Sequence, residues 1–165
     1  MNVLLRRFLL TLAALVWLPL ALAASPVIPK PGAMDLCPVC GMLVSKYPNW
    51  VAVVVYKDGH AHFFDGAKDL FKFIASPQKY DAGHQRDSIE AMWVTEFYGL
   101  KRIDARKAFY VIGSDVLGPM GHELVPLESE ADARDFLKEH KGRRLVSFDQ
   151  VTPEIVGGLD KGRIE

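Results

Sequence analysis

The sequence has little cysteine, no excess of either charge and no apolar run as long as an ordinary membrane-spanning helix. Lys and Arg together number 20, as do Asp and Glu. Proteins that bind nucleic acid neutralise phosphates with basic side chains, so the balanced charge gives no support to nucleic-acid binding. A structural zinc site normally has four Cys or His ligands. The two cysteines could complete such a site only with histidines.

The first 23 residues have the pattern of a secretory signal peptide. Residues 1–7 include two arginines and no acid, residues 8–20 are apolar, and residues 21–23 read Ala-Leu-Ala. We expect cleavage after Ala23, with an uncleaved membrane anchor as the alternative. The apolar run is short for a spanning helix of about 20 residues. No cysteine follows it, so the sequence does not predict a lipid anchor.

Removal of this signal would leave 18 of the 20 basic residues against 20 acidic ones, a net charge of about −2. The mature chain is then expected in a bacterial periplasm or outside the cell. That compartment is oxidising, so two nearby cysteines could form a disulfide there.

Residues 37–42 read Cys-Pro-Val-Cys-Gly-Met and gather three sulfur atoms into six residues. Thiolate and thioether are soft donors that favour Cu(I) over hard cations. Pro38 and Gly41 predict a tight turn, so we expect the thiols on a knuckle-like loop and not in a helix. The Pro-rich segment before the knuckle is expected to be an extended, mobile tether.

The hydrophobic pattern predicts an α+β fold with two tandem ββαβ units. The first unit contains apolar strands with an Asp-Gly turn between the first two, and an amphipathic helix that Asp65 is placed to cap. Its expected elements are strands 50–56, 60–64 and 91–98, a helix over 67–74 and a polar loop over 77–89.

The second unit repeats this order, and Ser129 is placed to cap its helix. Its expected elements are strands 108–113, 122–127 and 143–148 and a helix over 133–140. Thr152-Pro153 could start one helical turn, and the rest of the C-terminus is expected to fray. Each unit is small for a core of its own, so we expect the two to pack together. The predicted divisions are 1–23 signal peptide, 24–35 tether, 36–100 first unit, 101–150 second unit and 151–165 tail.

The cysteine pair permits several chemistries. A disulfide between Cys37 and Cys40 would close a short loop and stabilise little. A catalytic dithiol normally begins a helix in a βαβ unit, whereas here a Pro-rich tether precedes Cys37 and turn residues with a strand follow. Zinc could recruit His60 and His62, which share one face of the expected strand. Copper fits the compartment and the sulfur donors better.

A second candidate cluster lies in the loop Gly-Pro-Met-Gly-His, which contains Met120 and His122. Methionine in an exposed glycine-rich loop contributes poorly to a core. Thioether and imidazole both bind Cu(I), so we expect these two residues to act as ligands.

The ordered series of motifs resembles the NosL family, the accessory proteins for nitrous oxide reductase. The resemblance covers residues 36–148. Its motifs are the Cys-Pro-Val-Cys-Gly-Met stretch, Phe-Phe-Asp-Gly at 63–66, Trp-Val-Thr at 93–95, Ile-Asp-Ala at 103–105, Ala-Phe-Tyr-Val at 108–111 and Pro-Met-Gly at 119–121.

This resemblance implies a periplasmic Cu(I)-binding chaperone with a tandem ββαβ architecture similar to the organomercurial lyase core. It also implies sulfur ligands from the knuckle and from the Met-Gly loop. The implied recipient of the copper is a copper enzyme or the membrane complex that assembles it. The resemblance identifies this enzyme as nitrous oxide reductase. The first half is also similar to YHS metal-binding domains, which place a further cysteine where Asp65 stands. Because a carboxylate is a poor Cu(I) ligand, we assign Asp65 to helix capping.

The resulting hypothesis is a monomeric or weakly dimeric protein that binds one Cu(I) and passes it on by ligand exchange, without catalysing a reaction. The expected ligands, in descending order, are Cys40, Cys37, Met120, His122 and Met42. This shared site requires the knuckle and the Met-Gly loop to lie close together in the folded chain or across a dimer.

Overall fold

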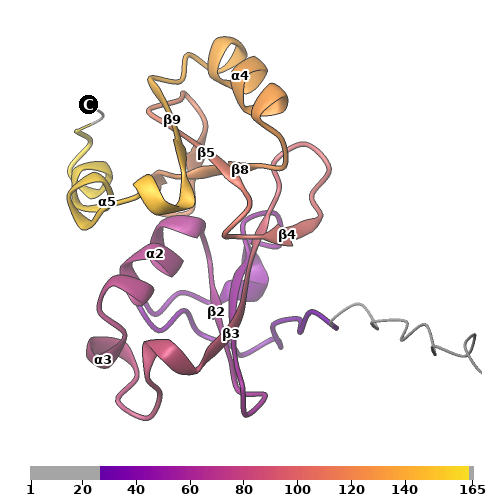
Figure 1. Ribbon diagram of the computed structural model, residues 1–165, viewed down its shortest axis with the longest axis vertical. Helices are drawn as coiled ribbons and strands as arrows, with labels where there is room; N and C mark the ends of the chain where they lie inside the picture. The colour runs from indigo at the N-terminus through magenta and orange to yellow at the C-terminus, as the bar shows by residue number, and fades with distance from the viewer. Residues whose placement is uncertain (1–26, 164–165) are drawn as a thin grey trace, which may run out of the picture.

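The computed structural model describes residues 27–163, so the predicted signal peptide and its cleavage point lie outside the described residues. The described chain forms two ββαβ units, one at each end of the molecule's long axis (Figure 1). This confirms the predicted fold class. From residue 27 to residue 163, the helices are all too short or too polar to span a lipid bilayer.

The first unit is an antiparallel sheet of order β2-β1-β3-β4 with α2 packed on it. Its central strand β1 is almost wholly buried, as its continuous apolar sequence predicts. Helix α2 turns Leu70, Phe73 and Ile74 toward the core, the stripe expected of an amphipathic helix. The elements are η1 (Val44–Lys46), β1 (Ala52–Tyr56), β2 (Ala61–Phe64), α2 (Ala67–Ala75), α3 (Pro77–Tyr80), η2 (Arg86–Ser88), β3 (Ile89–Thr95) and β4 (Arg102–Asp104).

The second unit is a smaller antiparallel sheet of order β8-β5-β9 with α4 packed on it. A short hairpin, β6–β7, is inserted between β5 and β8. The elements are β5 (Phe109–Ile112), β6 (Leu117–Gly118), β7 (Gly121–His122), β8 (Val125–Leu127), α4 (Glu130–Glu139), β9 (Arg144–Ser147), η3 (Phe148–Gln150) and α5 (Pro153–Asp160).

The two units share one strand order. In each, the first strand of the unit is central, the second lies on one side of it, and the strand after the helix lies on the other. This is the structural repeat that the sequence predicts. The main core cluster runs through both units, since it joins buried residues of β1 and α2 to residues of β5 and α5. Phe71 of α2 contacts the rings of Tyr110 and Phe148, with centroids 5.1 Å away in each case.

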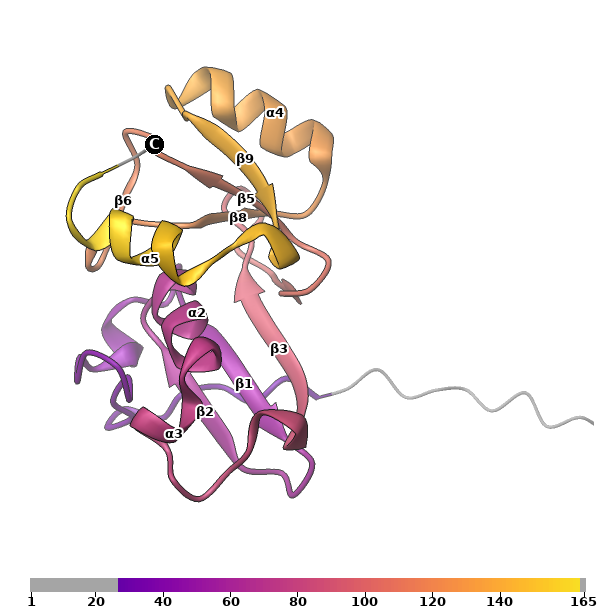
Figure 2. The same ribbon diagram turned by 60° about the vertical axis from the view of Figure 1, so that its left-hand side comes forward.

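Three sequence expectations are corrected by the structure. The expected polar loop over 77–89 contains α3 and η2, and the expected strand over 122–127 is divided into β7 and β8. The C-terminal tail does not fray after one turn, because α5 continues through Gly157 and Gly158 to Asp160. Buried Val156 and Leu159 hold α5 in place, and α5 lies beside α2 where the units meet (Figure 2). The strand β4, at residues 102–104, lies at the edge of the first sheet.

Candidate metal centre

The cysteine knuckle is a compact turn held by its own backbone. The Cys37 amide donates to the Met42 carbonyl at 2.8 Å, and the Gly41 amide donates to the Cys37 carbonyl at 2.8 Å. Gly41 has a φ of 78°, a conformation that glycine adopts without steric cost. A β-bridge between Leu36 and Leu43 closes the base of the loop. The expected knuckle is therefore present, and it presents both thiols from one side of a tight turn.

Two carboxylates of the first unit meet the two thiols. The Cys40 thiol donates to Asp65 Oδ1 at 3.2 Å, and the Cys37 thiol donates to Asp69 Oδ2 at 3.4 Å. One ligand atom from each of these four side chains lies within 4.8 Å of the other three. Both cysteines are free thiols. The cluster thus offers two sulfur and two oxygen donors in a space that suits one ion.

Burial sets the protonation of the thiols in the metal-free protein. Cys37 is 1% exposed, and this burial raises its thiol pKa far above the usual value, with Asp69 and Asp65 adding to the effect. Cys40 is half-buried, and burial raises its pKa to about 12. A dithiol catalyst needs a depressed thiol pKa, normally at a helix N-terminus. Neither condition holds here, so the arrangement disfavours thiol–disulfide exchange.

Asp65 does not cap α2, and this expectation from the sequence is wrong. The N-cap residue is Gly66, which has no side chain, and the Asp65 carboxylate points to Cys40. The free helix amide of Lys68 donates to Glu123 Oε1 at 2.6 Å, so a side chain of the second unit supplies the cap. A Cβ on Gly66 would lie 2.3 Å from Glu123 Oε2, which explains why glycine stands there.

A chain of ion pairs joins the knuckle to the β6–β7 hairpin. Asp69 contacts Lys72 at 3.0 Å, and Asp160 of α5 contacts both Lys72 at 2.9 Å and Lys68 at 3.2 Å. The buried Lys68 ammonium also donates to the Met120 carbonyl at 2.9 Å. Knuckle and hairpin therefore both rest on the N-terminal turns of α2.

The other three predicted ligands have different settings. Met120 is 42% exposed at the tip of the hairpin, and Met42 is half-buried in the knuckle. The His122 ring faces the end of α5, with its Cδ2 atom 4.0 Å from where a Cβ on Gly162 would lie. Its buried Nδ1 has no hydrogen-bond partner between residues 27 and 163. His122 is not among the described ligand atoms that converge on the two sulfurs. The ligand set remains a prediction.

Sequence reasoning missed Asp69 as a neighbour of the thiols and misjudged Asp65. The sequence contains only a weak signal for this pair, because Asp69 lies in the first turn of α2 whereas Asp65 precedes the N-cap residue Gly66. The alternative of zinc held by both cysteines with His60 and His62 is not supported, because those histidines belong to a separate cluster.

The chain is similar to known proteins over most of its length. The family model described as NosL matches residues 29–156. The chain belongs to the NosL family. It is 30% identical over 132 residues to a protein of Stutzerimonas stutzeri named copper-binding lipoprotein NosL, an alignment that covers 78% of this chain and 69% of that relative. The resemblance stated from the motifs is confirmed.

The NosL fold is also seen in a crystal structure. The copper chaperone NosL from Shewanella denitrificans superposes on this chain with a TM-score of 0.65 at 24% identity. The match covers 79% of this chain and 99% of the other. The knuckle and the β6–β7 hairpin both lie within residues 29–156, the part of the chain that the NosL family model matches.

Proposed function

We propose that this NosL protein is a periplasmic chaperone that binds Cu(I) and delivers it to a copper enzyme. The observation that carries the proposal is the pair of free thiols held by a rigid knuckle on one side of a turn. Soft sulfur donors favour Cu(I). The relatives support the same chemistry, because they are named as a copper-binding lipoprotein and a copper chaperone.

Cys37 and Cys40 are the primary ligands in this proposal. Met120 is the third, because the hairpin that carries it is anchored on the same turns of α2 as the knuckle. The carboxylates of Asp65 and Asp69 accept the thiol hydrogen bonds and orient the sulfurs; as hard donors they contribute little to Cu(I) itself. Met42 and His122 complete the proposed set as weaker candidates.

The unequal exposure of the donors suggests how the ion enters and leaves. Cys37 is almost wholly buried, whereas Cys40 is half-buried and Met120 is 42% exposed. A partner's ligand can approach from the side of Cys40 and Met120 while Cys37 still holds the ion. Low-coordinate Cu(I) accepts such an incoming ligand, so transfer needs ligand exchange and no catalysed reaction.

Family membership makes nitrous oxide reductase, or the membrane complex that assembles it, the recipient we propose. A periplasmic location follows from the signal-peptide pattern and agrees with the relative's name as a lipoprotein. Transfer is tested by mixing the Cu(I)-loaded chain with apo nitrous oxide reductase and measuring copper in the separated proteins. Retention of copper by this chain after prolonged mixing would contradict that recipient.

Binding is tested by competitive Cu(I) titration of the full chain under reducing, anaerobic conditions. Cys40→Ser and Met120→Ala should each weaken binding by at least about tenfold, which corresponds to roughly 1.4 kcal/mol. Met34→Ala is the matched control, since Met34 is 79% exposed and outside the proposed set. Unchanged affinity in both ligand variants, or an equal loss in the control, would overturn the site.

A further inference from the structure

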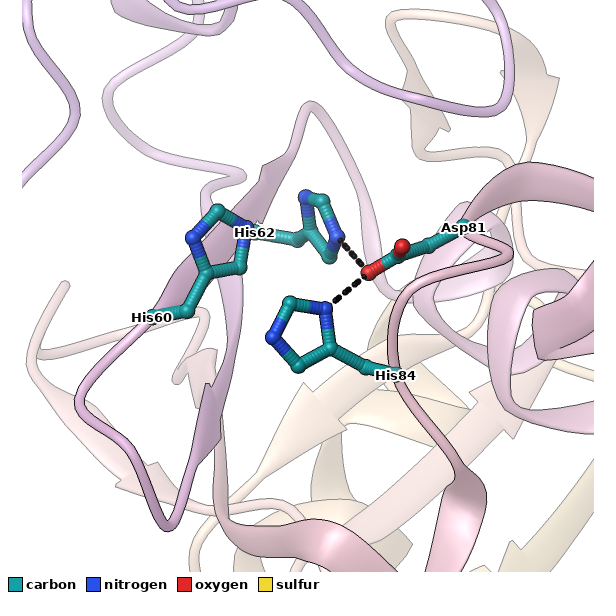
Figure 3. Close-up of side chains that lie close together, drawn as sticks. All are labelled: His60, His62, Asp81 and His84. Atoms are coloured by element: carbon teal, nitrogen blue, oxygen red, sulfur yellow. Dashed lines mark hydrogen bonds and ion pairs between the residues drawn. The ribbon is translucent and has the colours of Figure 1, made fainter.

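A second group of metal-ligating side chains lies at the far end of the first unit, away from the cysteines. It comprises His60 and His62, from the β1–β2 hairpin, and Asp81 and His84, from the loop after α3 (Figure 3). One ligand atom from each of the four lies within 4.8 Å of the other three. The sequence pointed only to the histidine pair of the hairpin.

Asp81 organises two of the imidazoles. Its Oδ2 atom lies 2.7 Å from His62 Nε2 and 2.7 Å from His84 Nδ1. Figure 3 marks both interactions with dashed lines. The Asp81 Oδ1 atom accepts a hydrogen bond from the Gly83 amide at 2.8 Å. Two ring nitrogens are thus directed at one oxygen. The side chains of His62, Asp81 and His84 are only 20%, 14% and 21% exposed, so the ring positions are fixed by packing.

The ring of His84 is oriented by residues outside the group, and the ring of His60 stacks on it. His84 Nε2 lies 3.1 Å from Asp58 Oδ2, and its ring stacks on buried Tyr56 with centroids 4.3 Å apart. Metal-ligating histidines commonly donate their second ring N–H to a carboxylate in this way, which leaves the first nitrogen for the ion. His60 stacks on His84 at 4.7 Å, and among the described residues no hydrogen bond engages its ring.

We propose that His60, His62, His84 and Asp81 form a binding site for a divalent transition-metal ion, with Cu²⁺ preferred to Zn²⁺. Imidazole nitrogens with one carboxylate are the donors that such borderline ions take, and a given nitrogen–oxygen site binds Cu²⁺ more tightly than Zn²⁺. The two sulfur donors of the knuckle favour Cu(I) instead. The two sites would therefore bind copper ions of different oxidation states at different places in the fold.

The two sites lie near opposite ends of α2. The cysteines contact Asp65 and Asp69 at its beginning, whereas His62 packs on Phe73 near its end. A nine-residue helix is about 13 Å long. One ion cannot bridge the two groups, so the histidine site does not rest on the Cu(I) proposal and can fail or succeed without it.

The experiment is a titration of the metal-free full chain with Cu²⁺ and, separately, with Zn²⁺. Both titrations use the Cys37→Ser/Cys40→Ser background so that thiols neither bind nor reduce the added ion. We expect one equivalent of Cu²⁺ to bind, with an electron paramagnetic resonance spectrum showing coupling to imidazole nitrogens. The competing Zn²⁺ titration should give a weaker constant.

His60→Ala is the decisive variant, because its ring makes none of the hydrogen bonds that hold Asp81 and His84. It should weaken Cu²⁺ binding by at least tenfold and remove one nitrogen from the spectrum while leaving the melting temperature of the metal-free protein unchanged. His140→Ala is the matched control, since His140 pairs with Asp115 in the second unit. It should bind Cu²⁺ like the background protein.

Three results would overturn the proposal. The first is the absence of stoichiometric Cu²⁺ binding, which would leave the group as a network of hydrogen bonds only. The second is an affinity that His60→Ala and His140→Ala change equally, which would indicate adventitious binding. The third is tighter binding of Zn²⁺ than of Cu²⁺, which would contradict the proposed preference.

Discussion

Helices α2 and α4 occupy the same place in the two repeated units, but their N-termini are completed differently. In α4 the cap is local, because Ser129 accepts a hydrogen bond from the Asp132 amide at 3.1 Å. In α2 the preceding Asp65 is turned to Cys40, and Glu123 of the other unit provides the cap. A carboxylate at or next to the N-cap position is ordinarily available for capping. Its use at the thiols requires a substitute from elsewhere in the fold.

The two units also differ in the groups that they carry outside their helix N-termini. The first unit carries the cysteine group and the histidine group at the two ends of its helix. The second has the same strand order, and its inserted hairpin brings Met120 and Glu123 to the first unit's helix. One copy of the repeat thus carries both clusters of convergent ligand atoms, and the other contributes the proposed ligand Met120 and the capping residue Glu123.

The largest expected effect comes from removing the remote cap. Glu123 is buried, and burial raises its pKa to about 8. Glu123→Ala should lower the free energy of unfolding by about 3 kcal/mol, because it leaves the buried Lys68 and Leu124 amides without their acceptor. Thermal and urea unfolding measure this loss. Glu123→Gln keeps an acceptor and should lose no more than about 1 kcal/mol. Equal losses in the two variants would contradict the capping role.

Removing the local cap of α4 should have a smaller effect. Ser129→Ala should cost about 1 kcal/mol of stability, the usual value for an exposed N-cap. It should leave Cu(I) affinity unchanged, because α4 packs against β5, β8 and β9 of the second unit. Urea unfolding and competitive Cu(I) titration of the same preparation measure both. A loss of copper affinity in Ser129→Ala would mean that α4 also supports the copper site, so that α2 would not be the only one of the two helices to do so.

The ion pairs of Asp160 should give a modest, pH-dependent contribution. Partial burial raises the pKa of its carboxyl, but the hydrogen bonds and charges of Lys72 and Lys68 outweigh burial and lower it below the ordinary value. Since the folded pKa is depressed, the stabilisation is complete above the unfolded pKa of about 3.9 and is lost as pH falls through the folded value.

Asp160→Asn should therefore lower stability by at most about 1 kcal/mol near neutral pH, because the carboxylate is partly exposed. The difference between the parent and variant melting temperatures should stay constant from pH 7 to about pH 4 and narrow below it. A difference in melting temperature that grows on acidification would contradict the lowered pKa of Asp160 in the folded protein.

The smallest effect is expected at an exposed pair between the units. Lys101 and Glu128 form an ion pair whose side chains are 55% and 53% exposed. Surface pairs of this kind contribute little, so Lys101→Met should shift the melting temperature by no more than about 2 °C. A shift as large as that of Glu123→Ala would mean that the units are held by their surface charges and not by the buried contacts at α2.

Hydrophobic periodicity predicted the long elements and the repeat, because β1 and α2 have strong patterns of their own. It failed where tertiary packing decides the outcome. Two glycines within α5 each cost about 1 kcal/mol of helix propensity, and this cost is offset only because Val156 and Leu159 are buried against the rest of the fold. The short strand β4 has too few residues for a period to be visible.

The candidate sites likewise include a part that a local sequence pattern predicts and a part that depends on tertiary packing. The knuckle was visible because its six residues are contiguous. The partners of the thiols were not, because Asp65 and Asp69 meet the cysteines only when α2 packs beside a loop 25 to 32 residues away. His84 and Asp81 reach the hairpin histidines from a segment that shows no strand or helix pattern strong enough to place it.

The hydrogen bond from Lys68 to Glu123 also bears on how the protein unfolds. Helix α2 cannot keep its first turn satisfied once the second unit has opened, and the main core cluster is continuous through both units. The two repeats should thus lose structure together, in one calorimetric transition whose measured enthalpy equals the van't Hoff enthalpy. The two repeated units are therefore expected to behave as a single cooperative folding unit.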